Sequence, residues 1–275
     1  MPQTRASPSL ADAQPRPGPI GVFDSGVGGL TVLHALHRRL PSAPMIYVGD
    51  TSHAPYGERS ETELRARCER IVGHLVGRGA RLVVVACNTA TVLAIEWLRQ
   101  RWPELTFVGV EPGVKPAAAR TRSGRIAVMA TPATSTSARL RRLIEAHAPQ
   151  LHVHVQPCPG LADAIERGVL EGPALQQILH PCCDGVNAAN VDTVVLGCTH
   201  YPFVEASIRQ LLAPRVELID TGAAVAERVA SLWSAADAAG APPIEVTSTG
   251  ATAIMQRLWR RQPGFESAAV ASFRC

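Results

Sequence analysis

Two stretches of the chain share one pattern, in which an apolar run ends at a cysteine followed by small polar residues. They are Arg81–Thr91, which contains Cys87, and Val191–Pro202, which contains Cys198. Valine- and leucine-rich runs without alternation are typical of parallel strands buried on both faces, and open α/β sheets bind ligands at the carboxyl ends of their strands. The pattern therefore predicts two parallel strands that each bring a cysteine to a ligand-binding edge.

The setting of the two cysteines has a chemical consequence. A helix that begins directly after each cysteine would place backbone N–H groups and the positive end of its dipole beside the sulfur. Such a setting lowers the pKa of a thiol from about 8.5 to roughly 3.5–7.5, so thiolates are expected at neutral pH. The alternative is that both cysteines are buried small hydrophobic residues, the usual role of a free cysteine. The repetition of the pattern favours a functional pair.

Predicted strands alternate with predicted helices along the chain, which indicates the α/β class with mainly parallel sheets. Because the cysteine-bearing strands recur about a hundred residues apart, we expect two similar three-layer units that face each other across an active-site cleft. The predicted strands outside the cysteine stretches are 19–23, 45–50, 105–110, 125–130, 151–155, 216–220 and 245–249.

Composition limits the classes of protein that fit. The chain has 275 residues, 46% hydrophobic and 18% charged, enough for two packed units. No apolar run of about 18 residues is present, and the proline-rich segment 1–18 lacks the apolar stretch of a secretory signal, so we expect a disordered tail, no membrane span and a cytoplasmic location. Seven cysteines, without zinc-ligand spacing, predict a reducing compartment and no metal.

Charge and aromatic content disfavour nucleic-acid binding. The net charge of +4 comes without a long basic run, and aromatic residues are only 4% of the chain. Arginines on solvated helix faces, such as Arg139, Arg141 and Arg142, account for most of the charge. Lys115, followed by Pro116, is the lysine available for a Schiff base with pyridoxal phosphate. We therefore predict chemistry without a cofactor.

Other segments also end predicted strands with polar residues. Asp24 precedes a glycine-rich turn that matches neither a dinucleotide fingerprint nor a P-loop; its N–H groups would suit a carboxylate, although Asp24 could instead be a helix cap. Pro55 and Gly57 flank Tyr56 in a turn that either holds the ring over a cleft or is purely structural. Thr131–Thr136 could bind a carboxylate or cap a helix.

Three further patterns predict structure rather than chemistry. A capping box at Ser60 opens a helix that ends before Gly79 and places Cys68 on its core face. The strand 151–155 alternates as a half-exposed edge strand does. A helix from residue 161 to 168 carries Asp163 and Glu166 one turn apart, an arrangement typical of a solvated face.

Two thiols that approach one small substrate from opposite sides suit a cofactor-free epimerisation. One thiolate removes a proton from a carbon, and the opposing thiol returns a proton to the other face. The α-hydrogen of an amino acid is a very weak acid, so donors such as Asn88, Thr89 and Thr199 would have to stabilise the carbanion or enolate.

With these motifs in place, the chain resembles the glutamate racemase family. The resemblance spans residues 19 to 260 or so, in the family's order. Its segments are Gly21–Leu30, Asp50–Thr51, Pro55–Gly57, Ala86–Ala90, Gly109–Pro112, Ala130–Thr134, Leu196–Pro202 and Ile219–Thr221.

The resemblance implies a role for each site residue. Cys87 matches the cysteine that acts on the D-enantiomer, assisted by Asp24, and Cys198 the one that acts on the L-enantiomer, assisted by His200. Glu166 would be a further catalytic helper, although the residues before it depart from the family's pattern. The implied substrate contacts are Asp24, Ser25, Tyr56, Gly57, Asn88, Thr89, Thr131, Thr134, Thr199 and His200.

The resemblance also implies an organisation and a biological role. The first α/β domain would comprise 19–114 plus 227–275, and the inserted second domain 115–226. The expected activity is interconversion of L- and D-glutamate by two cysteines, without metal or cofactor, in a cytoplasmic homodimer that supplies D-glutamate for peptidoglycan.

Two other functions remain open from the sequence. One is a racemase for aspartate or another amino acid, since paired cysteines and twofold architecture are shared more widely. The other is a non-catalytic binder of acidic ligands or a regulatory interaction protein, including the gyrase-binding role attributed to some glutamate racemases. Turnover of pure protein with L-glutamate or L-aspartate separates the three.

Overall fold

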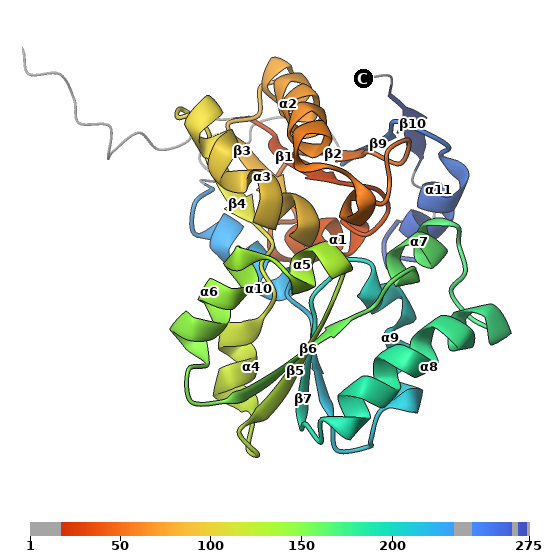
Figure 1. Ribbon diagram of the computed structural model, residues 1–275. Coiled ribbons are helices and arrows are strands. Elements are labelled where there is room, and N and C mark those ends of the chain that lie inside the picture. Colours follow the sequence, from red (N-terminus) through yellow and green to blue (C-terminus); the bar gives the residue numbers. More distant parts are fainter. Residues whose placement is uncertain (1–17, 234–243, 266–268, 274–275) are drawn as a thin grey trace, which may run out of the picture.

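The computed structural model describes residues 18–233, 244–265 and 269–273, and these fold around two parallel sheets (Figure 1). The predicted disordered tail lies outside the described residues apart from residue 18, and so do residues 266–268 and 274–275 of the C-terminal segment. Within the described part of the chain, no helix is long and apolar enough to cross a membrane.

The first sheet has six strands in the order β10-β9-β2-β1-β3-β4. Every pairing in it is parallel, as the sequence predicts. The unpredicted strand is β10, a three-residue edge strand with two exposed residues and therefore little apolar signal. The strand bounds are β1 Ile20–Asp24, β2 Met45–Gly49, β3 Leu82–Val85, β4 Thr106–Gly109, β9 Glu245–Ser248 and β10 Val270–Ser272.

Helices cover both faces of this sheet, which explains the unbroken apolar runs. In β3, Val83 and Val85 join the core beneath α2 (Glu61–Gly77) and α3 (Asn88–Arg101). Leu82 and Val84 join the core on the opposite face, together with residues of α1 (Leu30–Arg39), α10 (Gly222–Ala230) and α11 (Ala253–Arg260). A strand buried on both faces has no polar side to present to water, so its sequence does not alternate.

The second sheet has four parallel strands in the order β6-β5-β7-β8. Its edge strand β6 is half-exposed, as predicted from the alternation at 151–155. The strands are β5 Arg125–Ala130, β6 His152–Pro157, β7 Thr193–Leu196 and β8 Glu217–Ile219. The helices of this half are α4 Val114–Arg120, α5 Pro132–Ser135, α6 Ala138–His147, α7 Leu161–Glu166, α8 Pro173–Ala188 and α9 Glu205–Leu211.

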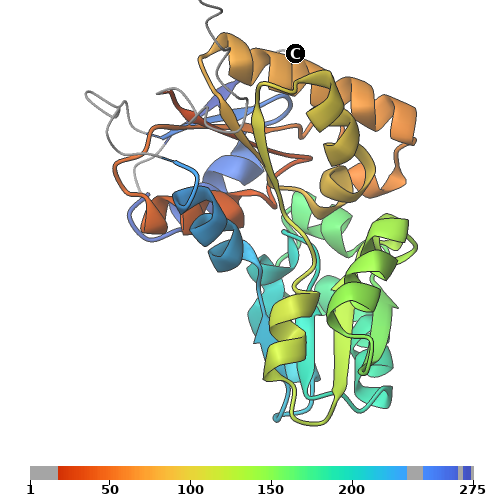
Figure 2. The same cartoon turned by 90° about the vertical axis from the view of Figure 1, so that its left-hand side faces the viewer.

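A continuous core joins the two halves. The chain also crosses between them twice (Figure 2). The chain enters the second half after β4 and leaves it after β8. Helix α10 then packs against α1 of the first half. The predicted boundary between residues 226 and 227 falls inside α10, so the packing favours a boundary before this helix. The division into two domains stays a prediction.

The capping box predicted at Ser60 is present. The Ser60 hydroxyl accepts from the Glu63 backbone N–H at 3.3 Å, and the Glu63 carboxylate accepts from the Ser60 N–H at 3.1 Å. Cys68, Ile71 and Leu75 of this helix are fully buried, which confirms the core role expected for Cys68. Helix α2 also carries Arg67 into the interior.

The cap allows a direct test of the local structure. Ser60→Ala leaves a helix-start N–H without its side-chain acceptor, so we expect the free energy of unfolding to fall by about 1 kcal/mol. Urea denaturation followed by circular dichroism measures the change. Thr62→Ala, at an exposed position in the same first turn, is the control and should change stability by less than about 0.5 kcal/mol. Equal losses in the two variants would contradict a capping role.

Candidate active site

Cys87 lies between β3 and α3, where the sequence places it. Helix α3 begins at Asn88, directly after the cysteine, and Cys87 is its N-cap residue. Its sulfur accepts from the Ala90 backbone N–H at 3.4 Å and donates to Ser25 Oγ at 3.8 Å. The thiol is thus held at a helix N-terminus, beside the turn that follows β1.

Cys198 has the corresponding place in the second sheet, two residues beyond β7. The chain then continues into a short 3-10 helix, η2 (Tyr201–Val204), and α9. The Cys198 sulfur lies 3.6 Å from His200 Nδ1. Both sulfur-bearing residues are only 5% exposed.

The two cysteines line one small cavity, to which both halves of the molecule contribute. Its volume is about 10 Å³, close to the minimum that holds one water molecule, so the walls of the two halves lie close together. Of the predicted contacts, Asp24 and Thr134 lie behind its wall. Ala162 lines it without having been predicted, because nothing in an apolar helical position marks a wall residue. The lining is formed by Ser25, Pro55, Tyr56, Gly57, Cys87, Asn88, Thr89, Thr131, Ala162, Cys198, Thr199 and His200.

Asp24 connects the two halves behind the cavity. Its fully buried carboxylate accepts from the Thr199 hydroxyl at 3.0 Å and from the Gly26 N–H at 2.7 Å. Burial raises the pKa of Asp24; the Glu166 carboxylate adds to this rise, and His200 opposes it. Asp24 therefore holds its own turn and is a partner of the opposite half. It does not cap α1, whose N-cap residue is Gly29, so the helix-cap alternative is wrong.

Glu166 reaches the site, although its sequence pattern indicated a solvated helix face. Its side chain is only 10% exposed, and its Oε1 accepts from His200 Nε2 at 2.5 Å and from the Val27 N–H at 2.8 Å. The solvated-face interpretation is wrong for this residue. Asp163, more exposed, pairs with Arg167 instead.

The glycine-rich turn is shaped by these side chains. A Cβ at Gly26 would overlap the Glu166 carboxylate, and one at Gly28 would overlap the His200 ring. The sequence suggested that this turn offers its N–H groups to a carboxylate. In the structure the carboxylate bound there, through Val27, belongs to the protein itself.

The pKa of His200 follows from its neighbours. Burial by itself lowers the pKa of His200, but the Cys198 sulfur and then the Glu166 carboxylate outweigh it and hold the pKa well above 6.5. Nδ1 faces the sulfur while Nε2 faces the carboxylate, so the ring connects the two. Such a chain can store and move a proton.

The expected low thiol pKa is wrong for Cys87. Burial raises the pKa of this thiol well above its usual range, and the negative charge of Asp24 adds to the rise. The hydrogen bond from Ala90 at the helix start acts in the opposite direction and is the weaker effect. The sequence prediction counted the helix dipole but not the desolvation, which disfavours a buried thiolate.

Hydroxyl and amide groups complete the walls. Thr89 and Thr131, from different halves, have their hydroxyl oxygens 3.2 Å apart, and Thr131 also caps α5 by accepting from the Thr134 N–H. Asn88 was predicted as a donor, but its amide nitrogen donates to the Val110 carbonyl at 3.2 Å. Its Oδ1 is buried without a protein partner, which leaves an acceptor that a ligand donor can satisfy.

One set of side chains in the described part of the chain could in principle ligate a metal. Asp24, Glu166 and His200 each place a ligand atom within 4.8 Å of the others. Both carboxylates, however, already accept hydrogen bonds from protein donors. Their arrangement suits proton transfer better than a metal centre.

The comparisons with known proteins agree with this geometry. Residues 26–229 match the model of the Asp/Glu/hydantoin racemase family. The chain belongs to this family. It is thus an enzyme of the racemase class of isomerases.

Individual relatives cover most of the chain. A glutamate racemase of Ectopseudomonas mendocina is 45% identical over 240 residues, which is 87% of this chain and 91% of that protein. One of Pseudomonas putida is 49% identical over 222 residues, 81% of this chain and 84% of its own. The crystal structure of Escherichia coli glutamate racemase with L-glutamate and an activator is 31% identical, with a TM-score of 0.78, and covers 94% of this chain and 99% of that chain.

The contact between Glu166 and His200 generates a prediction. Glu166 raises the pKa of His200 through its hydrogen bond and charge, so Glu166→Gln should lower it, and the ring should lose its proton at a lower pH than in the wild type. Titration of the His200 ring nitrogens by ¹⁵N NMR measures this shift.

Asp163→Asn is the matched control for that titration. It neutralises another carboxylate of the same helix, one that pairs with Arg167, and should leave the titration of His200 in place. An unchanged His200 titration in Glu166→Gln would show that the carboxylate does not control the proton on the ring.

Proposed function

We propose that this protein is a glutamate racemase that interconverts L- and D-glutamate by a two-cysteine mechanism, without a cofactor. The observation that carries the proposal is that Cys87 and Cys198, delivered by different sheets, line the same small cavity. Relatives named glutamate racemase cover most of the chain, and one solved relative holds L-glutamate.

In the proposed reaction the Cys198 thiolate takes the α-proton of L-glutamate. The electron pair of the broken C–H bond moves into the α-carboxylate, which becomes an enolate. Cys87 then gives its thiol proton to the opposite face of the carbon, and D-glutamate results. In the reverse direction the two cysteines exchange roles.

The different surroundings of Cys87 and Cys198 support these different roles. Burial and Asp24 raise the pKa of Cys87, so in the free protein this residue carries the proton that the L-to-D direction needs. The ammonium group of a bound amino acid, in the cavity beside Cys87, would offset the negative charge of Asp24 behind the wall and ease deprotonation of Cys87 for the D-to-L direction. His200 and Glu166 would control the proton on Cys198, as Asp24 does on Cys87.

The other lining groups would bind the substrate's charges. The unpartnered Oδ1 of Asn88 suits the ammonium group, and the hydroxyls of Ser25, Thr89 and Thr131 suit carboxylates. Enzymes lower barriers by about 8–23 kcal/mol in total, whereas a single oxyanion donor supplies about 2.7–4 kcal/mol. Several donors must therefore act together on the enolate.

The biological setting is part of the same proposal. We infer that the protein works in the cytoplasm as a homodimer and supplies D-glutamate for peptidoglycan. Activity toward aspartate or another amino acid, and non-catalytic binding of an acidic ligand, are the competing functions. The dialysed protein, tested with separate amino acids, distinguishes them.

The two-base mechanism predicts the behaviour of the cysteine variants. Cys87→Ala and Cys198→Ala should each lower racemisation of glutamate by at least about a hundredfold, because each removes one of two proton-transfer groups. Circular dichroism of the amino acid follows the reaction. Cys68→Ala, which alters a cysteine of the α2 core face, is the control and should retain activity. A fully active Cys198→Ala variant would refute the mechanism.

Substrate choice gives a second prediction. In a site built on hydrogen bonds, the shorter aspartate would leave distal donors unpaired, so kcat/KM for glutamate should exceed that for aspartate by at least roughly a hundredfold. The assay uses protein dialysed against a chelator and hydroxylamine, with no cofactor added. Comparable values for both substrates would support the broader racemase, and activity restored only by pyridoxal phosphate or a metal would exclude the cofactor-free reaction.

A further inference from the structure

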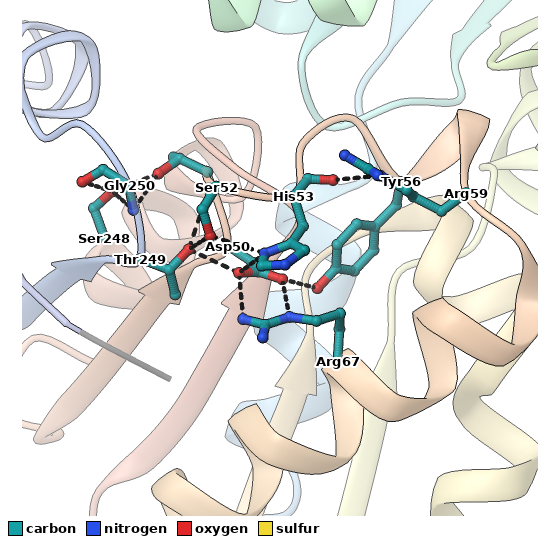
Figure 3. Close-up of polar contacts among 10 residues, drawn as sticks. Asp50, Ser52, His53, Tyr56, Arg59, Arg67, Ser248, Thr249 and Gly250 are labelled. Atoms are coloured by element: carbon teal, nitrogen blue, oxygen red, sulfur yellow. Dashed lines mark hydrogen bonds and ion pairs between the residues drawn. The ribbon is translucent and has the colours of Figure 1, made fainter.

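A buried carboxylate outside the cavity organises the loop that carries Tyr56. Asp50 follows β2 directly and is fully buried. Arg67 donates to both of its oxygens, at 2.8 and 3.0 Å, and the Tyr56 hydroxyl donates to Oδ2 at 2.7 Å (Figure 3). Thr249 donates to Oδ1 at 2.7 Å. We call Asp50, Tyr56, Arg67 and Thr249 the Asp50 cluster.

The donors outweigh the cost of burying this charge. Burial alone raises the pKa of Asp50, but the hydrogen bonds from Arg67, Thr249 and Tyr56, with the charge of Arg67, bring it below its usual value. Asp50 is thus held as an anion, and a buried charge whose partners are removed becomes strongly unfavourable. The cluster therefore strongly favours one position of the tyrosine hydroxyl.

Tyr56 links the cluster to the cavity. Its ring is 1% exposed and lines the cavity beside Gly57, while its hydroxyl is turned toward Asp50. The short 3-10 helix η1 (Tyr56–Glu58) packs against both α3 and α5. Since α3 and α5 belong to opposite halves, η1 bridges them at the cavity wall.

The last residue of β9 and the residues after it support the same loop from about 200 positions away in sequence. Thr51 Oγ1 lies 2.6 Å from Ser248 Oγ, and the Gly250 N–H donates to Thr51 Oγ1 at 2.9 Å. The hydroxyl of Thr249 both donates to Asp50 and accepts from the Ser52 N–H at 3.2 Å. Figure 3 shows these groups converging on the loop from the β9 side.

We propose that Asp50 and Thr249 are positioning residues for the racemisation, which hold the Tyr56 ring and the Gly57 backbone against α5 so that the cavity closes around the amino acid. The inference rests on the proposed function for the identity of the reaction. It assigns to the C-terminal segment after β9 a part in substrate binding, although Thr249 does not line the cavity.

The chemistry explains why such support matters. Excluding water strengthens the hydrogen bonds that stabilise an enolate, and a displacement of about 1 Å in a positioned group can cost about a hundredfold in rate. A wall formed by a loop without strand pairing of its own depends on side-chain hydrogen bonds for its position. The Asp50 cluster provides them.

The experiment compares two threonines of the same segment. Thr249→Val removes the hydroxyl that joins Asp50 to Ser52, whereas Thr247→Val removes a buried hydroxyl that donates to the Tyr47 carbonyl at 2.8 Å. We expect Thr249→Val to raise KM for glutamate about tenfold, with a smaller fall in kcat, and to speed amide hydrogen exchange in residues 51–57. Thr247→Val should do neither, even where both variants lose similar thermal stability.

Tyr56→Phe provides an independent test, because it keeps the ring and removes only the hydrogen bond to Asp50. It should raise KM in the same direction, and the double variant with Thr249→Val should lose less than the product of the single effects, since both act through Asp50. Equal KM and equal exchange in Thr249→Val and Thr247→Val would overturn the inference. If the wild type does not racemise glutamate, the proposed function fails, while the exchange measurement still decides whether the cluster holds the loop.

Discussion

The hydrogen bond from Thr199 to Asp24 is the interaction on which the site depends. It joins the last residue of β1 to the turn after β7, so the carboxyl ends of two separate parallel sheets meet at one point. The Thr31 hydroxyl reinforces it by donating to the Thr199 carbonyl at 3.1 Å, and Glu166 adds a second bridge through Val27. Without these contacts each cysteine would sit at the edge of its own sheet, facing no partner.

Closure of the two halves also determines the electrostatics of the thiols. Removing water from around Cys87 disfavours negative charge on its sulfur, and Asp24 adds to this effect. Cys198 differs because an imidazole lies beside it, and that imidazole is held by a carboxylate. Four strands of the first sheet, β2-β1-β3-β4, have the same order as β6-β5-β7-β8 of the second, but the charged groups beside the two cysteines differ. In the proposed reaction this difference would give the two faces of the bound carbon different proton donors and acceptors.

Much of the fold could be predicted because its determinants are local. The apolar strands β3 and β7, the capping box at Ser60 and the half-exposed edge strand β6 are all present as expected. The errors concern groups whose state depends on distant residues. The pKa of Cys87 depends on how deeply two halves bury it, and the position of Glu166 depends on the turn after β1.

Two further differences from the sequence predictions, at Asn88 and at the short strand β10, have related causes. The direction of the Asn88 amide is set by the Val110 carbonyl, which lies directly after β4, and no local pattern encodes that contact. Strand β10 is stabilised by pairing with β9 rather than by its own apolar content. The local pattern around Glu166 did not predict its place in the site. That prediction came only from the resemblance of the chain's motifs to a known family.

The glycine-rich turn illustrates how the protein limits where a substrate can bind. Its backbone N–H groups resemble an anion site. However, the Val27 N–H already donates to the Glu166 carboxylate, and the Gly26 N–H donates to the Asp24 carboxylate. A dicarboxylate substrate must therefore place its carboxylates against other donors, and the hydroxyls of Thr89 and Thr131 lie at the junction of the two halves. A ligand bound there would contact both halves at once, so its binding would stabilise the junction between them.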